Sequence, residues 1–193
     1  MSAPAPFPLP EFRPGRSADM RTQHFAGIVA WWNTARGPRA MPARADFLAE
    51  DLAPWWRYMN LLAVEPPNGD RTAHRYRYVY SGLKPMEYNG GDFTGRYIDE
   101  ALPQRMYAPA DAVYRACIAR RRPLYTLRHA AGKTGFPVVF EWLLLPLAAD
   151  GRNVDMFISL LERHVSATAD PQHSGAPDQM LNFDEFLAIE LND

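Results

Sequence analysis

The chain has 193 residues, a hydrophobic content of 47% and a formal net charge of -1, which together fit one globular domain with extended ends. A net charge this close to zero provides no global field to attract nucleic acid or anionic lipid. Its single cysteine excludes an internal disulfide, and no apolar run is long enough to cross a bilayer. We therefore expect a soluble, cytoplasmic protein that binds neither nucleic acid nor membrane.

Prolines dominate the N-terminal residues 1–18, where we expect disorder. Asp19 is then a suitable N-cap, and residues 19–37 have the apolar spacing of an amphipathic helix that ends at a glycine-proline pair. An exposed apolar face of this size needs a cover, which is either its own domain or a second copy of the chain. We predict a homodimer interface on this face, formed by Phe25, Ile28, Trp31 and Trp32.

Residues 38–165 are predicted to form the main domain. Its strands lie near 58–64, 74–80, 124–130, 138–147 and 154–161, and turns too short for parallel crossovers join neighbouring strands. Short glycine-rich helices follow the second strand, and residues 103–121 have the spacing of a longer helix. The expected fold is α+β: a five-stranded antiparallel sheet with helices on one face, plus the N-terminal amphipathic helix.

The C-terminal part divides into a polar linker, residues 166–178, and a docking segment, residues 179–193. Asn182 and Glu185 have the spacing of a capping box, so we expect a short helix over 180–191. A helix of this length is not stable alone in water. We therefore expect it to dock on its own domain, on a dimer mate or on another protein.

Several blocks of the main domain resemble a PAS-domain family that is common in alphaproteobacteria, often as stand-alone proteins. They are residues 32–46, Arg75-Tyr-Arg77, Gly90-Gly-Asp-Phe-Thr-Gly-Arg96 and residues 140–155. The order of the predicted elements also resembles the PAS fold. The resemblance covers about residues 31–161 and implies a sensor and signalling module, with no particular ligand. Tyr80 stands where the family usually has a small residue, which predicts a smaller pocket.

Aromatic residues converge between the sheet and the helices in such a fold. Core packing accounts for most of them, but buried tyrosine hydroxyls need hydrogen-bond partners. Apolar walls with a few polar groups are typical of a small-molecule site. We therefore predict a small ligand cavity bounded by Tyr78, Tyr80, Tyr88, Phe93, Tyr114 and Trp142.

No catalytic residue set and no metal site are predicted. The histidines do not occur at metal-ligand spacing, and the sequence contains neither a P-loop, a nucleophile elbow nor a dinucleotide fingerprint. The predicted long helix lacks the histidine that haem-binding PAS proteins use, and the residues around Cys117 do not resemble the motif of flavin photoreceptors. Neither haem nor covalently bound flavin is favoured, and the cofactor stays unknown.

Two carboxylates leave alternatives open. Glu141 lies in an otherwise apolar strand and needs a partner if it is buried; it either pairs with Arg75 or Arg77 on the outer face or points into the pocket. Asp92 either contacts a ligand or caps backbone amides in a turn.

We predict a non-catalytic sensor that binds a small ligand or a protein partner and signals by contact. The first alternative is a small pocket enzyme with isomerase-like acid–base chemistry, in which Glu141 or Asp92 works with a tyrosine. The second is an interaction adaptor without a ligand.

Overall fold

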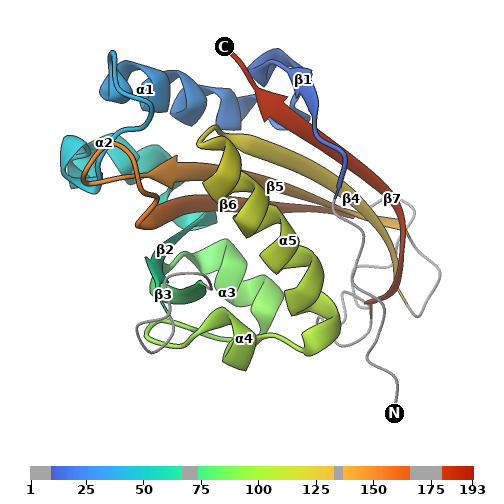
Figure 1. The fold of residues 1–193 in the computed structure, drawn as a ribbon. Coiled ribbons are helices and arrows are strands. Elements are labelled where there is room, and N and C mark those ends of the chain that lie inside the picture. The colour runs from blue at the N-terminus through green and yellow to red at the C-terminus, as the bar shows by residue number, and fades with distance from the viewer. Residues whose placement is uncertain (1–9, 67–73, 133–136, 166–179) are drawn as a thin grey trace.

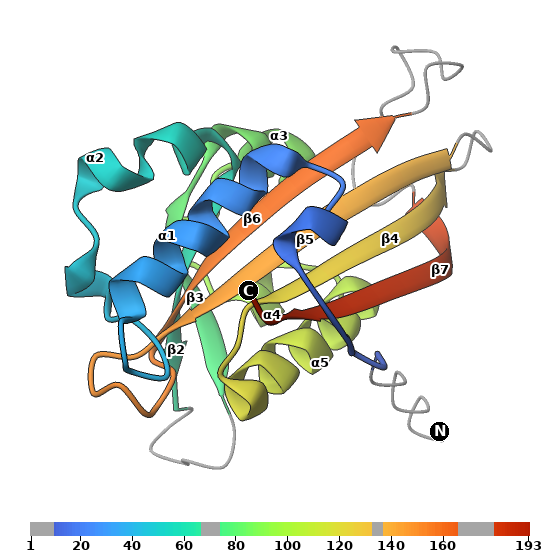
Figure 2. The ribbon, with the colours of Figure 1, turned by 90° about the horizontal axis from the view of Figure 1, so that it is seen from above.

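A seven-stranded mixed sheet with helices on both of its faces forms the centre of the protein (Figures 1 and 2). The computed structural model describes residues 10–66, 74–132, 137–165 and 180–193. The spatial strand order is β1-β7-β4-β5-β6-β2-β3, and every pair is antiparallel except β1–β7. The strands are β1 Arg13–Gly15, β2 Met59–Glu65, β3 Arg75–Ser81, β4 Leu124–Gly132, β5 Pro137–Leu147, β6 Met156–Val165 and β7 Met180–Leu191.

Five α-helices occur in the described residues, and they divide between the two faces of the sheet. They are α1 Ala26–Arg36, α2 Ala49–Leu52, α3 Leu83–Asn89, α4 Ile98–Ala101 and α5 Gln104–Arg120. The first helix crosses one face, while α3, α4 and α5 lie on the other (Figures 1 and 2). None of the helices in these ranges has both the length and the apolar character that a membrane span requires.

The predicted α+β class is confirmed, but the number of strands is wrong. Strands β2 to β6 and helix α5 correspond to the five predicted strands and to the predicted helix over 103–121. β1 and β7 extend the sheet beyond β4. The helix expected over 180–191 is therefore wrong, because this segment pairs along β4 as a strand. Residues 13–15 also form a strand instead of the expected disorder, whereas residues 1–9 and the predicted linker 166–178 lie outside the described residues.

The apolar face of α1 packs on the sheet of its own chain. Phe25, Ile28 and Trp32 are fully buried, and the indole Nε1 of Trp32 donates to the Pro146 carbonyl of β5 at 2.8 Å. The ring of Trp31 lies 3.9 Å from that of Phe47, between centroids. The dimer interface was predicted on this face because its apolar side chains would otherwise be exposed. The sheet of the same chain covers them, so they need no second copy. A homodimer stays a prediction, with no surface assigned to it.

Candidate functional site

A cavity of about 140 Å³ lies between the sheet and the helices α3 and α5. Five neighbouring strands, from β2 to β6, contribute its floor, and α3, α5 and Leu102, the residue after α4, contribute its cover. The lining residues are Asn60, Tyr78, Tyr88, Asn89, Leu102, Met106, Ala110, Tyr114, Thr126, Arg128, Phe140, Trp142, Ser159, Leu161 and Arg163. The walls are thus mostly apolar and aromatic, with a few polar groups, as in many small-molecule sites.

Small polar side chains form the inner end of this cavity. Asn60 and Ser159, which pair across β2 and β6, are each at most 5% exposed. The Ser159 hydroxyl accepts a hydrogen bond from Trp142 Nε1 at 2.9 Å. Asn60 Oδ1 has no hydrogen-bond partner among the described residues. Because an unsatisfied buried acceptor costs about 1–3 kcal/mol, a bound molecule that donates to this oxygen would gain from filling the cavity.

Two buried tyrosines supply neutral hydroxyls next to this inner end. Burial raises the pKa of Tyr78 and of Tyr114 well above the ordinary value. Both hydroxyls therefore keep their protons at neutral pH, and they can donate or accept a hydrogen bond but cannot act as a base. The ring of Tyr114 packs edge-on against Trp142 at 5.2 Å between centroids, which holds both rings in place.

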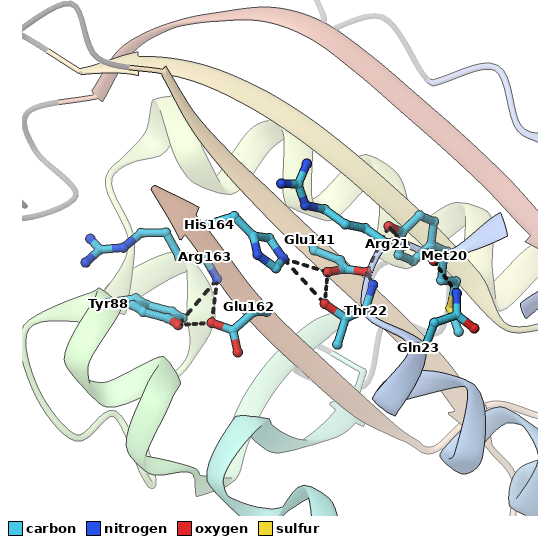
Figure 3. Close-up of polar contacts among 10 residues, drawn as sticks. Met20, Arg21, Thr22, Gln23, Tyr88, Glu141, Glu162, Arg163 and His164 are labelled. Atoms are coloured by element: carbon cyan, nitrogen blue, oxygen red, sulfur yellow. Dashed lines mark hydrogen bonds and ion pairs between the residues drawn. The ribbon is translucent and has the colours of Figure 1, made fainter. Parts of the chain in front are cut away.

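Arginines and larger apolar side chains form the more open end. Arg128, Phe140 and Arg163 are all partly exposed. The guanidinium of Arg163 lies over the ring of Tyr88, 5.0 Å from its centroid. The Tyr88 hydroxyl in turn donates to Glu162 at 2.6 Å (Figure 3). This end of the cavity therefore presents positive charge beside aromatic surface.

Four of the six predicted pocket residues line the cavity, namely Tyr78, Tyr88, Tyr114 and Trp142. Phe93 is not a lining residue; its ring packs against that of Tyr78 at 5.7 Å.

Tyr80 is also absent from the lining because of a β-bulge. Leu62 pairs with Tyr78 but Leu61 pairs with Tyr80, so one extra residue stands on β3. Adjacent residues of β2 face opposite sides, and Tyr80 therefore faces away from Tyr78. Its ring packs on Trp56 instead, at 5.2 Å between centroids.

This placement predicts that Tyr80→Ala leaves the affinity for benzene unchanged, because no cavity wall is removed. The matched change Met106→Ala enlarges the cavity and is expected to alter benzene binding. Both affinities are measured by NMR titration. An equal change in the two variants would contradict the assignment of Tyr80 to the other face.

A second polar cluster surrounds Glu141 on the opposite face of β5 (Figure 3). Its carboxylate is fully buried, and its Oε1 accepts from the Thr22 amide at 2.7 Å and from the Tyr125 hydroxyl at 2.9 Å. The other oxygen accepts from the Thr22 hydroxyl and lies 2.8 Å from His164 Nε2. The cluster therefore ties the segment before α1 to the sheet.

The pocket position predicted for Glu141 is wrong, and on the face away from the cavity, which the other interpretation gave it, the predicted arginine partners are wrong. Alternation along β5 places Phe140 and Trp142 in the cavity, so Glu141 faces the other side. The proposed arginine partners are engaged elsewhere: Arg75 pairs with Asp99 at 2.7 Å, and Arg77 pairs with Glu65 at 2.5 Å. Sequence reasoning missed Thr22, Tyr125 and His164 as partners, because none of them is near Glu141 along the chain.

Asp92 forms the turn that one of the two interpretations predicted. It accepts from the backbone amide and the hydroxyl of Thr94 at 2.8 and 2.7 Å. These hydrogen bonds, led by the one from the hydroxyl, lower the pKa of Asp92. It does not line the cavity.

Cys117 is not among the residues that line the cavity. The Cys117 thiol is buried, its pKa is raised by burial, and it donates to the Arg122 carbonyl at 3.3 Å. In the ranges that the structure covers, no three His, Cys, Asp or Glu side chains are grouped so that they could hold a metal ion.

Comparisons with protein-family models, with curated proteins and with solved structures found no match.

Proposed function

We propose that this chain is a PAS-type sensor domain that binds a small ligand in the cavity and signals to a protein partner by contact. The cavity carries the proposal: it is lined by aromatic residues and contains the unpaired acceptor of Asn60 at its inner end. The order of elements also supports it, since β2–β3, the short helices, α5 and β4–β6 follow one another as the family resemblance implies.

The size of the cavity indicates a ligand of few atoms. Its volume is close to that of an engineered apolar cavity of about 150 Å³ that binds benzene. Ligands this small gain at most about 1.5 kcal/mol per non-hydrogen atom, so we expect affinities from micromolar to millimolar. A screen for the ligand must therefore include concentrations of several millimolar.

The isomerase-like alternative has less support from the geometry. A general acid or base must lie within hydrogen-bond reach of its substrate. Glu141 does contact a tyrosine, as that alternative required, but its carboxylate faces away from the cavity and already has four polar contacts. Asp92 is occupied by its own turn.

Filling the cavity tests the proposal. Ala110→Phe places a ring in the cavity and is expected to weaken phenol binding at least about tenfold, which corresponds to about 1.4 kcal/mol. Ala119→Phe, at an exposed position of the same helix α5, is the matched control and should bind like the wild type. NMR titration with phenol measures both, and native mass spectrometry of the purified protein searches for a co-purified ligand.

Equal phenol affinity in the wild type and in Ala110→Phe would exclude the cavity as the binding site. If the wild type binds no small molecule at all, the interaction adaptor becomes the better interpretation.

A further inference from the structure

The register of the sheet arranges the cavity floor in three rows across β4, β5 and β6. The outer row is Arg128–Phe140–Arg163, and the next is Thr126–Trp142–Leu161. In the inner row Ser159 lines the cavity, with Asn60 beside it on β2. The floor thus has its charged side chains in the outer row and only neutral side chains in the other two rows.

The charge in the outer row has one sign. Among the described lining residues there are two arginines and no aspartate, glutamate or lysine. Burial lowers the pKa of Arg128 to about 10, so it is still protonated at neutral pH. Glu162, the nearest acid along β6, accepts from the Tyr88 hydroxyl and from the Arg163 backbone amide.

Arg163 is held in a position suited to recognition. Its guanidinium lies over the Tyr88 ring, and that ring is fixed through the hydrogen bond of its hydroxyl to Glu162 (Figure 3). A stacked guanidinium keeps its edge N–H groups available for a planar acceptor, and a carboxylate matches them with two parallel hydrogen bonds.

We infer that the ligand is a small organic carboxylate with an aromatic or other apolar body. Its carboxylate binds the guanidinium of Arg163 in the outer row, and its body lies on Trp142 and Leu161. This inference rests on the proposed function, because it names the class of ligand for the same cavity. A donor at the far end of the molecule would reach the unpaired Oδ1 of Asn60.

Benzoate and its neutral analogue benzamide test the inference, because they differ in charge but hardly in shape. The wild type is expected to bind benzoate at least about tenfold more tightly than benzamide, as for a hydrogen bond to a charged group. This preference should decrease at high salt because the arginine row is partly exposed. Isothermal titration or NMR measures both affinities.

Arg163→Met keeps an apolar stem but removes the charge, and is expected to abolish the preference for benzoate while benzamide binds as before. Arg152→Met, in the exposed β5–β6 turn, is the control and should keep the preference.

Equal binding of benzoate and benzamide by the wild type would overturn the inference and leave the proposed function intact. The wild-type comparison decides this even if Arg163→Met does not fold. If neither compound binds at up to several millimolar, while the protein is folded, both the proposed function and this inference fail.

Discussion

Replacing Glu141 with leucine is expected to lower the free energy of unfolding by about 3–5 kcal/mol, the usual cost of removing one partner of a buried charged cluster. The change leaves the Thr22 amide and the Tyr125 hydroxyl without their acceptor, at a position where Glu141 and Tyr125 are fully buried. It also leaves His164 without its carboxylate contact. Urea unfolding measures the difference, provided that the slope of the free energy with urea stays constant.

The same variant is expected to expose the segment before α1. Hydrogen exchange should become faster at the Thr22 amide and in α1, because Glu141 connects this segment to β5. Glu190→Ala is the matched control: it breaks the partly exposed ion pair with Arg120 and should cost less than about 1 kcal/mol. A Glu141→Leu protein as stable as this control would show that the cluster does not hold the segment on the sheet.

Trp32→Ala is the second large effect that we expect, again about 3–5 kcal/mol in the free energy of unfolding. The indole is fully buried between α1 and the sheet, and its removal leaves a cavity and a Pro146 carbonyl without its donor. Trp32→Phe retains most of the buried ring and should cost less. Trp56→Ala, at a side chain that is 38% exposed, is the control and should cost about 1 kcal/mol or less.

The Trp32 variants also distinguish a core position from the dimer interface predicted from the sequence. At a core position, Trp32→Ala lowers stability without changing the mass of the folded species in light scattering. A variant that keeps its stability but changes from dimer to monomer would contradict the packing of α1 on its own sheet.

Local patterns in the sequence were sufficient for the centre of the fold. Strands β2 to β6 alternate or form continuous apolar runs between turn residues, and α5 has helical spacing. All six elements overlap the ranges predicted for them, although β6 extends to Val165 instead of ending near 161. Four of the cavity residues were also found, because aromatic residues on neighbouring strands and on the covering helix must meet in the space between the layers.

The remaining assignments needed the tertiary structure because their causes are not local. One extra residue at the β-bulge turns Tyr80 to the other face of the sheet. At the bulge, the sequence of β3 contains no glycine or other turn residue from which it could be predicted. The segment over 180–191 has capping residues suited to a helix, but Leu187, Ile189 and Leu191 also alternate as in a strand. The segment forms a strand because it lies along the edge of β4. Pairing with β4 gives its backbone N–H and C=O groups hydrogen-bond partners along the segment.

Glu141 illustrates the same limit at a single side chain. The sequence shows that a carboxylate in an apolar strand needs partners, but it left the face of Glu141 open. The placement of Phe140 and Trp142 in the cavity then assigns Glu141 to the other face by strand alternation. Its partner Thr22, however, is 119 residues away along the chain. Only the packing of the segment before α1 across the sheet brings the two together, because burial of a charge is stable only where the folded chain supplies enough hydrogen bonds.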